Sequence, residues 1–84
     1  MSKYVFVSSD GSDILSTQFD TLEEARARLK KFVADALPDS YKGDPLDYES
    51  EEGYSWATED SCYLCSLDTK LHDDHTAKVI AVDF

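Results

Sequence analysis

The chain has little positive charge and no long apolar run. Its 84 residues include 8 lysines and arginines against 18 acids, which leaves a formal net charge of −10. Direct binding to the phosphate backbone of DNA or RNA is not expected, because such binding needs clusters of lysine and arginine. No apolar stretch approaches the roughly 20 residues that a membrane-spanning helix requires, and an anionic lipid surface would repel the chain.

Cysteine is also scarce, with two residues in the whole chain. Residues 1–5 carry neither the basic segment nor the apolar segment of a secretory signal, so we expect a cytoplasmic protein. In that compartment the two cysteines are expected to remain thiols. The stability of so small a domain must then come from a compact core or from assembly with a partner.

What the chain does contain is enough apolar material for one folded domain over residues 1–84. Hydrophobic residues make up 42% and aromatic residues 12%, too many for a disordered acidic tail. The charge is uneven. Residues 1–38 hold six acids and five bases, a net of −1, whereas residues 39–84 hold twelve acids and three bases, a net of −9. The sequence thus predicts a nearly neutral scaffold followed by an acidic half.

Residues 1–38 predict a hairpin and a helix. Residues 4–7 and 14–19 are rich in β-branched and aromatic side chains, and the Asp10-Gly11 pair between them suits a tight turn. Thr21 and Glu24 have the spacing of a helix N-cap and its third helical residue. An apolar stripe then runs at three- and four-residue spacing to position 37, and Pro38 ends the helix.

Residues 39–84 predict a loop, residues 39–53, followed by three strands at 54–58, 61–67 and 76–84. The unbroken apolar run 79–82 indicates a strand with neighbours on both edges. The resulting order is ββαβββ. We therefore predict an α+β fold in which one amphipathic helix packs on a curved, mostly antiparallel sheet. The other face of that sheet would be solvated or kept for a partner.

The segment 44–60 is the strongest candidate for a binding site, since it holds seven acids and no base. In an extended chain Asp47, Glu49 and Glu51 would share one side at about 6.7 Å spacing, comparable with the phosphates of a nucleic-acid strand. Aromatic residues, which are enriched at interfaces, are interleaved with these acids. The residues that we predict to bind a partner are Asp44, Asp47, Tyr48, Glu49, Glu51, Glu52, Tyr54, Trp56, Glu59 and Asp60.

Two interpretations of this segment remain open. It could imitate nucleic acid and occupy a groove rich in lysine and arginine on another protein, with association that weakens as salt is added. It could equally be a solvated acidic loop that keeps a small protein soluble. The concentration of charge in one half of the chain and the interleaved aromatic residues favour a binding role.

In size and charge, the whole chain resembles the small acidic inhibitors of phages and mobile elements, such as anti-CRISPR proteins and other nucleic-acid mimics. The resemblance rests on the acids of residues 44–60 together with Tyr48, Tyr54 and Trp56. It implies a non-enzymatic inhibitor that blocks a host nuclease or CRISPR effector where that protein would hold DNA or RNA. No cofactor is implied.

The helix also carries a basic cluster, Arg26, Arg28, Lys30 and Lys31. This cluster could be a solvated helix face, could pair with the acidic half of the chain, or could contact a phosphate. A further alternative for the whole protein is a structural or regulatory module that forms a homodimer through exposed sheet faces or edges.

The last alternative is a small zinc-stabilised module. Cys62, Cys65, His72 and His75 form a C-x2-C-x6-H-x2-H pattern, although a zinc finger usually has about twelve residues between its pairs. In a strand, positions 62 and 65 would also face opposite sides. No helix follows the cysteines to lower a thiol pKa, which argues against redox activity. We found no catalytic motif around the histidines, so we do not expect an enzyme.

Overall fold

The computed structural model describes residues 2–50 and 53–83 and has an α+β fold. The elements follow the order β1 (Ser2–Ser9), β2 (Ile14–Phe19), α1 (Leu22–Ala36), β3 (Trp56–Ala57), β4 (Ser61–Leu64) and β5 (His75–Asp83). A short 3-10 helix, η1 (Pro45–Asp47), lies between α1 and β3. The predicted ββαβββ order is confirmed.

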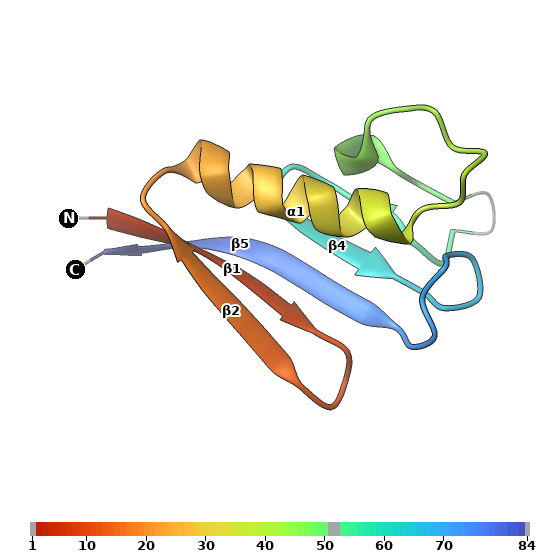
Figure 1. Cartoon of the computed structure of the whole chain (residues 1–84), viewed down its shortest axis with the longest axis horizontal. Helices are drawn as coiled ribbons and strands as arrows, with labels where there is room; N and C mark the ends of the chain where they lie inside the picture. Colours follow the sequence, from red (N-terminus) through yellow and green to blue (C-terminus); the bar gives the residue numbers. More distant parts are fainter. Residues whose placement is uncertain (1, 51–52, 84) are drawn as a thin grey trace.

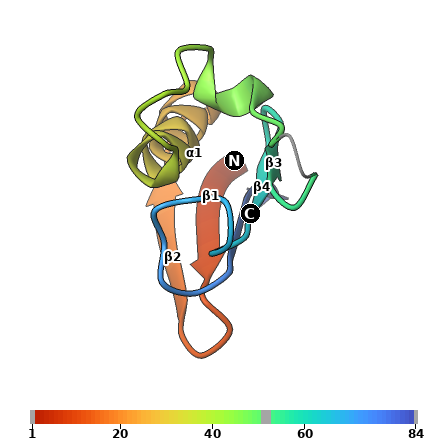
Figure 2. The same ribbon diagram turned by 90° about the vertical axis from the view of Figure 1, so that its right-hand side faces the viewer.

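The five strands form one sheet in the order β2-β1-β5-β4-β3, and every neighbouring pair is antiparallel. Helix α1 lies across one face of this sheet (Figure 1). Figure 2 shows β2 and β3 at opposite ends of the sheet. The arrangement confirms the predicted single helix on an antiparallel sheet, and it leaves the second face without a covering helix in the described part of the chain.

The β1–β2 hairpin turns at the predicted glycine. Gly11 has φ +91°, a conformation that residues with a Cβ rarely adopt. The Asp10 carboxylate accepts hydrogen bonds from the backbone N–H groups of Ser12 at 2.9 Å and Asp13 at 2.8 Å. These two bonds hold the pKa of Asp10 below its ordinary value, and they hold the turn together.

Helix α1 begins and ends close to the predicted residues. The Thr21 hydroxyl accepts a hydrogen bond from the Glu24 N–H at 3.2 Å, which satisfies one free donor of the first turn. The helix ends at Ala36, where Leu37 is extended and Pro38 follows. Its buried residues, Ala25, Leu29, Val33 and Ala36, are all members of the predicted apolar stripe.

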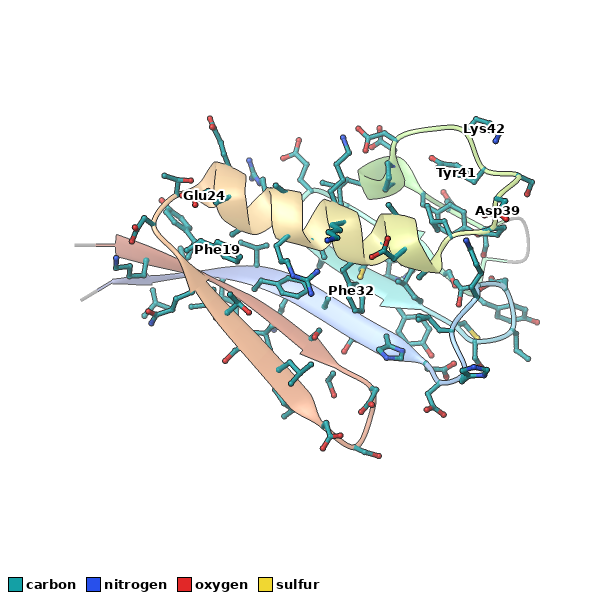
Figure 3. All side chains as sticks on the ribbon, viewed as in Figure 1. Phe19, Glu24, Phe32, Asp39, Tyr41 and Lys42 are labelled. Carbon is teal, nitrogen blue, oxygen red and sulfur yellow. The ribbon has the colours of Figure 1, made fainter. Side chains whose placement is uncertain are left out.

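The core lies between this stripe and the sheet. Phe6 of β1 contacts Phe32 of α1, with ring centroids 5.7 Å apart, and the Arg28 guanidinium lies over the Phe6 ring at 4.8 Å. Phe32 and Phe19 are both placed between helix and sheet in Figure 3. Leu64 and Cys62 of β4 extend the core towards the far end of the sheet.

Two strands are shorter than predicted. β3 covers residues 56–57, not 54–58, and it ends before Thr58 because the Thr58 hydroxyl accepts from the N–H of Ser61 at 3.2 Å and turns the chain there. β4 ends at Leu64, not at residue 67, because the N–H of Asp68 donates to the Cys65 carbonyl at 3.3 Å. Both strands end early because side-chain or turn hydrogen bonds compete with the hydrogen bonds between strands.

β5 is the strand that the apolar run predicted, with β1 on one side and β4 on the other. It begins at His75, one residue earlier than expected, and the predicted last residue, Phe84, lies outside the described residues. β4 pairs with residues 75–78 of β5, so residues 80–82 pair with β1 alone in the described register. The apolar run therefore continues past the part of β5 that has two neighbours.

Candidate functional site

The acidic segment forms the edge of the sheet beyond β4. Residues 48–50 run antiparallel beside β3, since the Ala57 N–H donates to the Tyr48 carbonyl at 2.8 Å and the Ser50 N–H to the Ser55 carbonyl at 3.0 Å. Glu49 and Trp56 form an antiparallel bridge between the two segments. We call the described residues 44–50 and 53–60 the acidic edge.

Glu49 and Trp56 lie on the face of the sheet that α1 does not cover. Opposite residues of an antiparallel pair project to the same face, and successive residues of a strand alternate. Ala57 and its partner Cys62 are buried on the helix side, so Trp56, its neighbour Tyr63 and Glu49 project to the other face. The result is a row of one carboxylate and two aromatic rings across three adjacent segments.

Two aromatic rings of the acidic edge remain accessible. Trp56 is 42% exposed and Tyr54, on the turn that leads into β3, is 52% exposed. Trp56 and Tyr63 border a surface depression of about 280 Å³ whose lining also includes Val7 and Lys78. The Tyr63 hydroxyl donates to Asp74 at 3.2 Å, and the negative charge of Asp74 raises the pKa of Tyr63.

Tyr48 was predicted to bind a partner, but the alternation of side chains along residues 48–50 directs it into the core. This residue is 6% exposed and belongs to the core, where its ring meets Tyr41 edge to face at 4.9 Å. Because Glu49 projects outwards, Tyr48 and Ser50 on either side of it project inwards. Tyr48 therefore supports the acidic edge from within and offers little surface to a partner.

The predicted extended spacing of Asp47, Glu49 and Glu51 is wrong at Asp47. This residue ends the 3-10 helix η1, whose N-cap is Asp44 and whose first residue is Pro45. The Asp44 carboxylate accepts from the Leu46 N–H at 2.9 Å. An Asp-Pro pair at a helix start is a recognisable sequence signal, and it could have predicted this turn. Glu51 and Glu52 lie outside the described residues.

The basic cluster of α1 pairs with part of the acidic edge. Arg26 lies 2.8 Å from Asp60 and 3.4 Å from Glu59, and Lys30 lies 3.9 Å from Asp44. The hydrogen bond to Asp60 is the main cause of a raised Arg26 pKa. Pairing across the fold, one of the open alternatives for this cluster, is thus observed for Arg26 and Lys30.

The remaining acids of the edge face solvent. Asp47 and Glu49 are exposed, and neither forms an ion pair with any residue that the structure describes. Exposed ion pairs are weak, and Arg26 carries one positive charge against the two carboxylates beside it. The edge therefore keeps a negative balance, with Asp47 and Glu49 as its most available charges.

A buried polar network holds the edge against the rest of the domain. Ser55 is fully buried, its hydroxyl donates to Asp68 Oδ1, and it accepts from the Cys65 N–H at 2.8 Å. The Ser55 N–H donates to the Ser50 hydroxyl at 3.1 Å. This network, which joins the turn before β3 to the turn after β4, was not anticipated from the sequence.

The cysteines and histidines of the zinc alternative are not brought together. Cys62 is buried, and burial raises the pKa of its thiol to about 12. Cys65 is also buried, His72 is exposed, and the His75 ring packs beside Phe32 at 5.9 Å. Among the residues that the structure describes, no three His, Cys, Asp or Glu side chains are placed to hold a metal ion. The described geometry gives the zinc alternative no ligand set.

Comparison with protein-family models, with curated proteins and with solved structures found no match. Within residues 2–50 and 53–83, no helix is long and apolar enough to cross a membrane.

Proposed function

We propose that this protein is a non-enzymatic inhibitor whose acidic edge occupies a basic, nucleic-acid-binding surface of another protein. The observation that carries the proposal is the placement of Glu49 beside Trp56 on the sheet face opposite α1. Asp47 and Tyr54 are exposed on the same edge. Carboxylates next to accessible aromatic rings match a partner surface that binds both phosphates and bases.

The charge distribution supports the same proposal. Residues 39–84 hold a net charge of −9, and a concentrated field of one sign accelerates association with a surface of the opposite sign. Lysine and arginine side chains that normally contact phosphates would contact the carboxylates of the edge. The proposed partner is a host nuclease or a CRISPR effector in the cytoplasm, and the proposed source is a phage or another mobile element.

Capture of a partner from a host lysate and the salt dependence of the association rate test the proposal. The immobilised protein should retain a nucleic-acid-binding protein from a host lysate at low ionic strength and release it as salt rises, because ionic screening weakens attraction between exposed charges. The captured protein, once purified, should associate roughly ten- to a thousandfold faster at low salt than at high salt. Capture of proteins that bind no nucleic acid, or an association rate that salt does not change, would count against the proposal.

A homodimeric interaction module is the second candidate. The observation that favours it lies at the opposite end of the sheet, where β2 is exposed along almost its whole length.

A further inference from the structure

Strand β2 is an edge strand without the usual protection of an edge. It pairs with β1 on one side and ends the sheet on the other. Of its six residues, five are exposed and Phe19 is half-buried. Ile14 is 74% exposed and Leu15 is 69% exposed. Because adjacent residues of a strand project to opposite faces, β2 is exposed on both faces here. Figure 1 shows the hairpin tip extending away from α1.

The sequence of β2, Ile-Leu-Ser-Thr-Gln-Phe, contains no charged residue and no proline. Proteins normally protect an exposed edge with lysine, proline, a bulge or a covering segment, because the unpaired N–H and C=O groups of an edge pair readily with another strand. β2 pairs residue for residue with β1, without a bulge. In a chain that is 31% charged, a neutral, regular and exposed edge strand is suited to pairing with another strand.

We propose that β2 pairs with β2 of a second copy of this chain, so that the two sheets join into one continuous antiparallel sheet. A two-fold axis perpendicular to the sheet keeps both helices on the same face. It places odd-numbered residues of one β2 opposite odd-numbered residues of the other, and even-numbered residues opposite even-numbered ones. With the axis at Thr17, Leu15 lies opposite Phe19 of the second copy. Ser16 then lies opposite Gln18, so apolar residues meet apolar ones and polar residues meet polar ones.

Charge favours this pairing over other contacts between two copies. In this register Asp20 lies opposite Ile14 of the second copy and Asp13 opposite Thr21, so no acid faces an acid directly. The acidic edge lies at the other end of the sheet, beyond β4. Pairing through β2 therefore keeps the two most negative regions apart, whereas pairing through the acidic edge would bring them together. Both acidic edges stay free to bind a partner.

The proposed dimer does not rest on the proposed inhibitory function. The two proposals predict opposite effects of salt on association. Two copies with a net charge of −10 each repel one another, so added salt should strengthen the dimer. The same salt should weaken binding to a basic partner. Sedimentation equilibrium of the purified chain is expected to show a concentration-dependent dimer of the 9.5 kDa protomer, with tighter association at high salt.

Leu15→Lys tests the edge, and Leu67→Lys is its matched control. Leu67 is 79% exposed on the turn after β4, so both variants replace an exposed leucine with the same charge. We expect Leu15→Lys to weaken dimerisation at least tenfold and Leu67→Lys to leave it unchanged, with both variants folded by circular dichroism. A monomeric wild-type chain at every concentration, or equal effects of the two variants, would overturn the proposal.

The register has its own test, which does not depend on affinity. Thr17 would face Thr17 of the second copy, with Cα atoms about 4.5–5.5 Å apart, within the range of about 4.4–6.8 Å that a disulfide needs. With oxidised glutathione, Thr17→Cys should form a covalent dimer. Gln18→Cys should not, because the two substituted positions would be displaced by a further 6.7 Å or so along the strand. Equal cross-linking of both variants, or of neither, would contradict the proposed register.

Discussion

Replacing Asp47 and Glu49 together by lysine is expected to lower the affinity for the proposed basic partner by roughly a hundredfold. The two carboxylates are exposed and unpaired among the described residues, so they are free to meet lysine or arginine. Placing like charges across an interface costs several kcal/mol, and about 1.4 kcal/mol corresponds to a tenfold change in the dissociation constant. Most of the loss should appear as slower association, which surface plasmon resonance measures directly.

The control for this variant carries the same change in net charge elsewhere. Glu23 and Asp35 are exposed on α1 and form no ion pair in the described part of the chain. Replacing both by lysine should slow association slightly and leave the dissociation rate unchanged. If the two double variants lose affinity equally, net charge alone governs binding and the acidic edge is not a specific site.

Ser55→Ala is expected to lower the free energy of unfolding by about 2–4 kcal/mol. The substitution removes the donor to Asp68 and the acceptor for the Cys65 N–H, both in a fully buried position. The second oxygen of Asp68 is already buried without a hydrogen-bond partner in the described residues. In the variant the first oxygen would also lose its donor, the Ser55 hydroxyl. A buried polar group without a partner costs its full desolvation penalty.

Urea denaturation of Ser55→Ala and of Ser40→Ala tests this expectation. Ser40 is exposed on the loop after α1, and no side-chain hydrogen bond is seen for it in the described structure. Its replacement should change stability by less than about 0.5 kcal/mol. If Ser55→Ala is as stable as Ser40→Ala, the buried network does not hold the acidic edge in place.

The first half of the chain could be predicted closely because its signals are local. Thr21, Glu24 and Pro38 mark the ends of α1 within one residue, and Asp10-Gly11 marks the hairpin turn. Capping, proline geometry and turn chemistry act over a few residues, so the sequence contains the information directly. The apolar run in 79–82 similarly indicated a strand, although β5 has two neighbouring strands only over residues 75–78 and the run itself pairs with β1.

The second half was predicted less well because its structure depends on distant partners. Ser50, Ser55 and Asp68 form a network across 18 positions of sequence, and no local pattern marks it. Tyr48 is buried because residues 48–50 pair with β3, a contact that composition cannot show. Asp47 is the exception, because Asp44-Pro45 is a local signal for the start of a helix. The prediction of an extended chain through Asp47 did not take this signal into account.

The central claim is that the acidic edge takes the place of nucleic acid on its partner, and competition tests it most directly. A labelled oligonucleotide bound to the purified partner should be displaced by the wild-type protein, and this should be measured by fluorescence anisotropy at fixed low salt. We expect displacement to be complete with the wild type and with Glu23→Lys/Asp35→Lys, and to be lost with Asp47→Lys/Glu49→Lys. Formation of a ternary complex, in which the partner holds the oligonucleotide and the wild-type protein together, would contradict the claim.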